Sequence, residues 1–94
     1  MNLSKIKTYI GFAKKSRQII YGLDSIKEKK AYIIVYSEGL SESSKNGCVK
    51  AAIKSGCKTY QISDDDMLEL MNIEKIKAFA ITNSELAKAI ESNM

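Results

Sequence analysis

Apolar residues near the N-terminus of the chain recur at intervals of three or four, at Leu3, Ile6, Ile10 and Ala13. That interval is the period of an amphipathic helix, so the pattern predicts a helix over residues 3–16. The β-branched run at 18–21 predicts a short strand. Gly22 follows this strand, and the amphipathic stretch after it predicts a two-turn helix over 23–30.

The middle of the chain contains its longest apolar run, residues 31–37, which is rich in β-branched and aromatic side chains. A run of this kind is typical of a central strand that is covered on both faces. Capping serines follow it, and residues 43–55 are predicted to form a helix that stops at Gly56. The residues expected along the inward face of this helix are Cys48, Val49, Ala52 and Ile53.

The last third of the chain repeats the alternation of strand and helix. Residues 58–63 and 77–82 are predicted strands. Ser63 is followed three positions later by Asp66, which indicates the capped start of a helix between these two strands. Asn83 or Ser84 is expected to cap a final helix. Its predicted inward residues are Leu86, Ala87 and Ile90.

Strands that alternate with helices in this way predict an α/β protein. We expect a three-layer α-β-α sandwich with a mixed four-stranded sheet. With 94 residues, no repeat and no proline-rich or glycine-rich linker, the chain is expected to form one domain over residues 1–94.

Charge is distributed unevenly along the chain. Residues 1–58 hold 12 Lys or Arg against 4 acids, a balance of +8, and residues 59–94 hold 3 against 7, a balance of −4. The first part of the chain is therefore expected to build a positive face suited to phosphates or to an acidic surface. The alternative is an ordinary lysine-rich surface, and the ratio of 14 lysines to one arginine favours that alternative.

The residues that most enzymes need are missing from the sequence. There is no histidine, and two cysteines alone cannot complete a four-ligand zinc site. The glycines stand singly, so no phosphate-binding loop is present. We therefore expect a non-enzymatic protein without cofactor or metal. No apolar stretch reaches the length of a membrane span and no export signal is visible, so the expected location is the cytoplasm, with two reduced thiols.

The junction at Gly22 is the best candidate for a binding site. A glycine between strand and helix lets a ligand approach the backbone, and the first turn of a helix favours an anion. Such a junction could hold an RNA backbone and meet base edges. The candidate contacts around it are Lys14, Lys15, Arg17, Leu23, Asp24, Ser25 and Lys27. The alternative is that Gly22 is only a turn residue.

Three segments together resemble a known family: "IGFAKKSRQIIYGLDSI", "AYIIVYSEGLSESSKNGCVKAAIKSGCKTYQI" and "KIKAFAITNSELAKAI". They are similar to bacterial members of the ribosomal protein L-seven-Ae / L-thirty-e superfamily, the kink-turn RNA binders. The resemblance covers nearly all of the chain. It implies an α-β-α sandwich, a structured RNA partner such as ribosomal RNA or another kink-turn-like RNA, and association with the ribosome.

The resemblance also implies roles for individual residues. In the family, an Asn-Glu-x-x-Lys pattern after the glycine reads tandem G·A pairs and meets phosphate; Gly22 matches, but Asp24, Ser25 and Glu28 replace that pattern. The family's second RNA-facing loop corresponds to residues 72–75. Ile73 is the expected apolar contact there, and Lys75 the phosphate contact. We therefore predict weak discrimination for kink-turns. The alternative is a protein-protein interaction module that has lost the RNA site.

Overall fold

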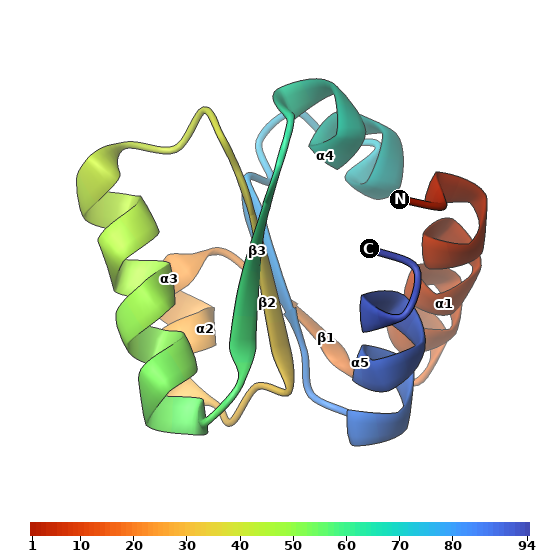
Figure 1. Cartoon of the computed structure of the whole chain (residues 1–94), viewed down its shortest axis with the longest axis horizontal. Helices are drawn as coiled ribbons and strands as arrows, with labels where there is room; N and C mark the ends of the chain where they lie inside the picture. Colours follow the sequence, from red (N-terminus) through yellow and green to blue (C-terminus); the bar gives the residue numbers. More distant parts are fainter.

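The computed structural model describes all residues 1–94, and its nine elements follow the predicted alternation of helix and strand (Figure 1). The elements are α1 (Leu3–Lys15), β1 (Ile19–Tyr21), α2 (Leu23–Glu28), β2 (Ile33–Ser37), α3 (Glu42–Ser55), β3 (Lys58–Ile62), α4 (Asp64–Met71), β4 (Ala78–Ile81) and α5 (Ser84–Glu91).

The four strands form one mixed sheet in the order β1-β4-β2-β3. β2 and β3 are parallel and are joined through α3, whereas β4 is antiparallel to both of its neighbours, β1 and β2. The predicted mixed four-stranded sheet is therefore confirmed. β4 is the last strand in the sequence, yet it lies between β1 and β2.

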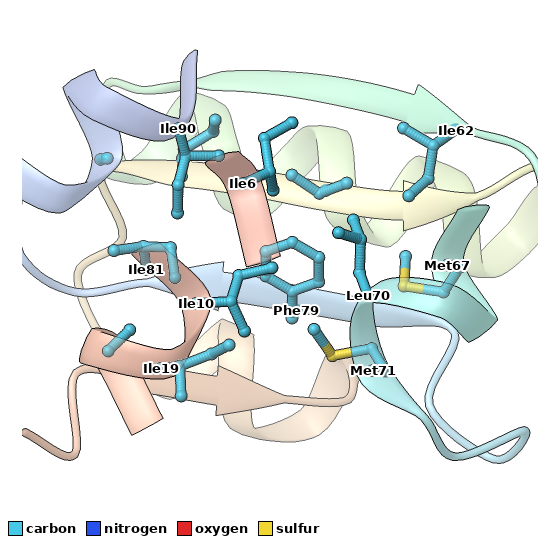
Figure 2. Packing of buried hydrophobic residues seen from close by; sticks show 14 residues of the cluster. Ile6, Ile10, Ile19, Ile62, Met67, Leu70, Met71, Phe79, Ile81 and Ile90 are labelled. Atoms are coloured by element: carbon cyan, nitrogen blue, oxygen red, sulfur yellow. The ribbon is translucent and has the colours of Figure 1, made fainter. Parts of the chain in front are cut away.

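Helices cover both faces of this sheet, which makes the molecule a three-layer sandwich as predicted (Figure 1). α1, α4 and α5 pack on one face around a core of 14 buried residues. Figure 2 shows Phe79 of β4 in the middle of this core, close to Ile10 and Met71. α2 and α3 pack on the other face around a smaller core of eight buried residues.

The central strands supply both cores because successive side chains point to opposite faces. In β4, Phe79 and Ile81 belong to the larger core, and Ala78 and Ala80 belong to the smaller one. β2 divides in the same way, with Ile34 on the side of the smaller core. The expectation that residues 31–37 include a central strand covered on both faces is confirmed.

Side-chain caps fix the starts of four helices, and Asn2 caps α1 by accepting a hydrogen bond from the N–H of Lys5. Ser41 caps α3 and Ser63 caps α4, each by accepting a hydrogen bond from a backbone N–H three residues later. Of the two residues expected to cap the last helix, Asn83 does so by accepting from the N–H of Leu86. Gly56 ends α3, as predicted.

The inward face of α3 differs from the expected one. Cys48 and Ala52 are buried as predicted, but Val49 is 39% exposed and Ile53 is 75% exposed. Gly47 and Ala51 are buried instead. This rotation places small residues against α2 and against the alanines of β4, so the helix packs closely where larger β-branched side chains would not fit.

Several predicted boundaries were too long. The helix after Gly22 ends at Glu28 rather than at residue 30, because Lys29 is already extended. The strands are each shorter by one or two residues than expected. No helix in the structure combines the length and the apolar character needed to cross a bilayer.

Candidate nucleic-acid interface

Gly22 connects β1 to α2 in a backbone conformation that other residues avoid. Its φ is 79° and its ψ is 150°, a region that is essentially restricted to glycine. Its N–H donates to the carbonyl oxygen of Ala78 at 3.1 Å, and its carbonyl accepts from the N–H of Ile26 at 3.1 Å. A Cβ added at Gly22 would have no heavy atom within 4 Å. Gly22 is therefore a structurally required turn residue, and its backbone is also open to approach.

The loop before β4 lies at the same end of the sheet as Gly22. Because β4 is antiparallel to β1 and β2, its first residues lie beside the last residues of both strands. Ala78 bonds Gly22, and the carbonyl of Lys77 accepts from the N–H of Ser37 at 2.8 Å. The structure thus places the two segments expected to face RNA at the same end of the sheet, although they are about 50 residues apart in the sequence.

A set of polar contacts centred on Asp64 fixes the loops at this end. The Asp64 carboxylate accepts hydrogen bonds from the buried Ser37 hydroxyl and from the N–H of Gly39, the latter at 3.0 Å. Lys77 Nζ lies 3.9 Å from the same carboxylate. The Ser37 hydrogen bond, helped by Gly39 and Lys77, holds the pKa of Asp64 below its usual range. These contacts tie the β2–α3 loop, the start of α4 and the loop before β4 together.

Three of the candidate basic residues lie away from Gly22. Lys14, Lys15 and Arg17 are exposed at and just beyond the end of α1. The neighbouring Gln18 bonds Thr82, at the end of β4 opposite to Ala78. The span from residue 18 to Gly22 is about 13 Å at about 3.3 Å per residue. These three residues therefore do not lie next to Gly22, because the length of β1 separates them from it, and their contact with RNA stays a prediction.

Leu23 also differs from its expected role. It is half-buried and packs with the smaller core. A Cβ added at Gly47 of α3 would lie 2.7 Å from Leu23 Cδ2, so α2 and α3 approach each other closely at this point. Leu23 is thus a packing residue between the two helices. The other candidates of α2, which are Asp24, Ser25, Lys27 and Glu28, are exposed.

A basic groove, the α2–α3 groove, runs between these two helices. Its walls carry Lys27 from α2 and Lys50 and Lys54 from α3, with Ser43 and Asn46 at one end. At the other end the groove continues past Glu28 to Lys29 and Lys30. Cys48 lies on the buried side of α3. Burial raises the pKa of its thiol, and the positive charge of Lys27 partly offsets that rise.

Lys50 and Lys54 were not among the predicted site residues. Their spacing of four places them on one side of a helix. That spacing was the available signal, but it does not reveal that α2 packs alongside α3 and brings Lys27 to the opposite wall. The helix pairing depends on Gly47, where an added Cβ would lie 2.7 Å from Leu23 Cδ2, and a single glycine in a helix does not by itself indicate such a contact.

The loop before β4, which was the second segment expected to face RNA, has acidic surroundings. Ile73 and Lys75 are exposed, as an RNA contact would require. Ile73, however, lines a shallow depression together with Leu68 and with the carboxylates of Asp64, Asp65 and Glu74. Its apolar side chain is available, but the local charge opposes phosphate.

The two cysteines are free. Cys48 is buried and Cys57 is half-buried. Burial raises the pKa of the Cys57 thiol, and the nearby Glu91 carboxylate raises it further. Both groups are therefore protonated thiols at neutral pH. No cluster of three or more His, Cys, Asp or Glu side chains is arranged to hold a metal ion.

Comparison with known proteins supports the fold. No protein-family model matches the sequence, and no curated protein matches it either. Among solved structures, the chain is similar to a protein with unknown function from Bacillus halodurans C. The TM-score is 0.75 at 9% sequence identity, and the match covers 94% of each chain. This likeness shows a shared α/β fold.

Proposed function

We infer that this protein is a small, non-enzymatic RNA-binding protein of the ribosomal L-seven-Ae-like type. The observation that carries the proposal is the open Gly22 backbone at the start of α2, the helix that forms one wall of the basic α2–α3 groove. The proposed partner is a structured RNA in the cytoplasm, either ribosomal RNA or another kink-turn-like RNA. Association with the ribosome is part of this proposal.

The groove places positive charge on both sides of a bound RNA strand. Lys27 on one wall faces Lys50 and Lys54 on the other, and none of the three takes part in an ion pair within the protein. Their ammonium groups are therefore free to contact phosphates, which are the dominant source of affinity in nucleic-acid binding. Ser43 and Asn46 add hydrogen-bonding groups at the end of the groove where α3 begins.

The proposed binding is weakly selective for kink-turns. Asp24, Ser25 and Glu28 are exposed on α2, where the resemblance places the base-reading and phosphate-contacting side chains. A carboxylate at residue 24 accepts hydrogen bonds but does not donate them. Glu28 brings a negative charge close to the expected phosphate. Electrostatic attraction along the groove, rather than base reading, should therefore dominate.

Binding to a kink-turn RNA and to a control RNA without its G·A pairs tests this proposal at two salt concentrations. The double variant Lys50→Gln/Lys54→Gln should reduce the salt dependence by about 0.7–0.9 per lost phosphate contact. The control is Lys5→Gln/Lys7→Gln, which removes two charges from the exposed side of α1. Because Lys7 Nζ lies 3.7 Å from Glu69, the stability of this variant is measured alongside its binding. The absence of binding at low salt, or equal losses in the two double variants, would contradict the proposal.

A protein-protein interaction module is the second candidate. It is favoured by the acidic surface around Leu68 of α4, which is 42% exposed, and Ile73 of the loop that follows α4, which is 50% exposed. An apolar centre with a carboxylate rim suits a basic peptide better than it suits RNA. This candidate becomes the preferred function if structured RNA does not bind at low salt.

A further inference from the structure

A hollow of about 360 Å³ lies at the opposite end of the sheet from Gly22, where β2 and β3 begin and α5 passes beside them. We call it the end hollow. Its polar and aromatic lining includes Lys30, Tyr32, Ser55, Lys58, Ser84 and Lys88. Its size is within the range of about 300–1,000 Å³ that is typical of small-ligand sites. Neither the Gly22 junction nor the loop before β4 contributes to it.

The end hollow carries excess positive charge. Glu91 is the only acid among its lining residues, and it already accepts a hydrogen bond from the Tyr60 hydroxyl at 3.0 Å and lies 3.7 Å from Lys58 Nζ. Lys30 and Lys88 form no ion pair with the protein. Two uncompensated ammonium groups therefore border the hollow, with two serine residues, Ser55 and Ser84, beside them.

Tyr32 gives the end hollow an aromatic surface. The residue is 40% exposed although it lies just before the buried strand β2. Lys30 Nζ lies over its ring, 5.5 Å from the ring centre, so a base that stacks on this face displaces the ammonium group from the ring. Proteins that bind single-stranded nucleic acids combine such rings, on which bases stack, with lysines or arginines that follow the phosphates. A small inorganic anion would use the lysines but would leave the ring exposed.

The end hollow adjoins the α2–α3 groove, because Lys30 and Ser55 border both. Together the two regions hold seven lysines against Glu28 and Glu91, a formal charge of +5. That charge exceeds the +4 of the whole chain. An RNA strand bound in the groove would therefore remain in contact with lysines as far as Tyr32.

We propose that the end hollow binds a nucleotide of single-stranded RNA, with the base stacked on Tyr32 and the adjoining phosphates held by Lys30 and Lys88. The proposal concerns a different surface from the Gly22 junction, and it does not require recognition of a kink-turn. It assigns this end of the molecule to an unpaired segment of RNA.

Fluorescence anisotropy with labelled octauridylate, which has no kink-turn and no stable duplex, tests the proposal at low salt. Tyr32→Leu should weaken binding by roughly 5- to 150-fold, the range measured for losing one stacked base, whereas Tyr32→Phe should retain it. Phe12→Leu is the matched control, because Phe12 is an exposed aromatic residue of α1 outside the end hollow. Lys88→Gln should lower the salt slope by about 0.7, and Lys5→Gln should leave the slope unchanged.

Three outcomes would overturn the inference. These are no octauridylate binding at low salt, equal losses for Tyr32→Leu and Phe12→Leu, or binding of uridine monophosphate as tight as that of the octamer, which would make the hollow a mononucleotide site. A kink-turn RNA without unpaired tails should bind Tyr32→Leu and the natural protein equally. Failure of kink-turn binding with intact octauridylate binding would contradict only the kink-turn part of the proposed function, so the two tests fail separately.

Discussion

Single residues determine what the start of α2 can do. Gly22 has a backbone conformation restricted to glycine, and a Cβ there would meet no neighbouring atom. The strain and the open space have different consequences: the first concerns stability, and the second concerns access for a ligand. Asp24, Ser25 and Glu28 follow on the exposed side of the helix, where their chemistry rather than their packing matters.

Replacing Gly22 should destabilise the protein although nothing crowds the site. Gly22→Ala should lower the free energy of unfolding by about 1–3 kcal/mol, because an alanine must adopt the strained conformation. Gly11 is the matched control, since it lies inside α1 with no heavy atom within 4 Å of an added Cβ. Gly11→Ala should raise the free energy of unfolding by about 0.5–1 kcal/mol. Urea denaturation measures both, and changes of equal sign would contradict the assignment of strain to Gly22.

Restoring the family pattern on α2 should improve the choice of RNA. The triple variant Asp24→Asn, Ser25→Glu and Glu28→Lys should prefer a kink-turn RNA over the control without G·A pairs more strongly than the natural protein does. Each recovered base contact contributes about 1–3 kcal/mol of discrimination. Glu28→Lys alone should strengthen binding to both RNAs, because it replaces a repulsive charge.

Competition binding with the two RNAs measures this preference. A natural protein that already prefers the intact kink-turn by several hundredfold would show that other residues read the bases. A triple variant that folds normally without any gain would remove the Gly22 end from the proposed RNA surface.

At the scale of elements, the sequence predicted the order of helices and strands because hydrophobic periodicity and capping residues are local signals. Orientation was harder to predict. Val49 and Ile53 looked like core residues by composition, but the packing of Gly47 against Leu23 turns α3 so that both are exposed. Lys50 was not predicted as a site residue for the same reason, since its position in a groove depends on how α2 and α3 pack.

The contacts of Asp64 join three segments and should make their stability depend on pH. The pKa of Asp64 is lower in the folded protein than its usual value of 3.8. Its contribution to stability is therefore complete above that usual value and is lost as the pH falls towards the lower folded pKa. Ser37→Ala removes the largest cause of the shift, so it should bring the pKa of Asp64 closer to normal and weaken the loss of stability in acid.

Urea denaturation between pH 6 and pH 2.5 measures this effect, and an NMR titration of the Asp64 carboxyl group reports its pKa directly. Asp65→Asn is the control, because it removes a carboxylate from the same turn of α4 without touching Ser37 or Gly39. An unchanged Asp64 titration in Ser37→Ala would contradict the role given to the hydroxyl group.

At the scale of the whole molecule, the charges are sorted along the direction of the strands. The end where β2 and β3 finish carries Glu38, Glu42 and the carboxylates of α4. Two lysines near this end are engaged with those acids, Lys45 with Glu42 and Lys77 with Asp64. The lysines of the opposite end are mostly unpaired. The sequence predicted unequal charge but not its direction, because that direction depends on which strand ends lie together.

The position of β4 has a consequence for how the chain folds. β4 is the only strand paired with β1, and it also pairs with β2. β1 therefore cannot join the sheet until the last fifth of the chain has been synthesised. A fragment of residues 1–77 should therefore show no cooperative unfolding transition by circular dichroism, although it contains three of the four strands. A cooperative transition in that fragment would contradict this expectation. Pairing residues some 60 positions apart also delays folding, because a long loop must close first. During synthesis, the nascent chain must therefore carry exposed strand edges until its final strand arrives.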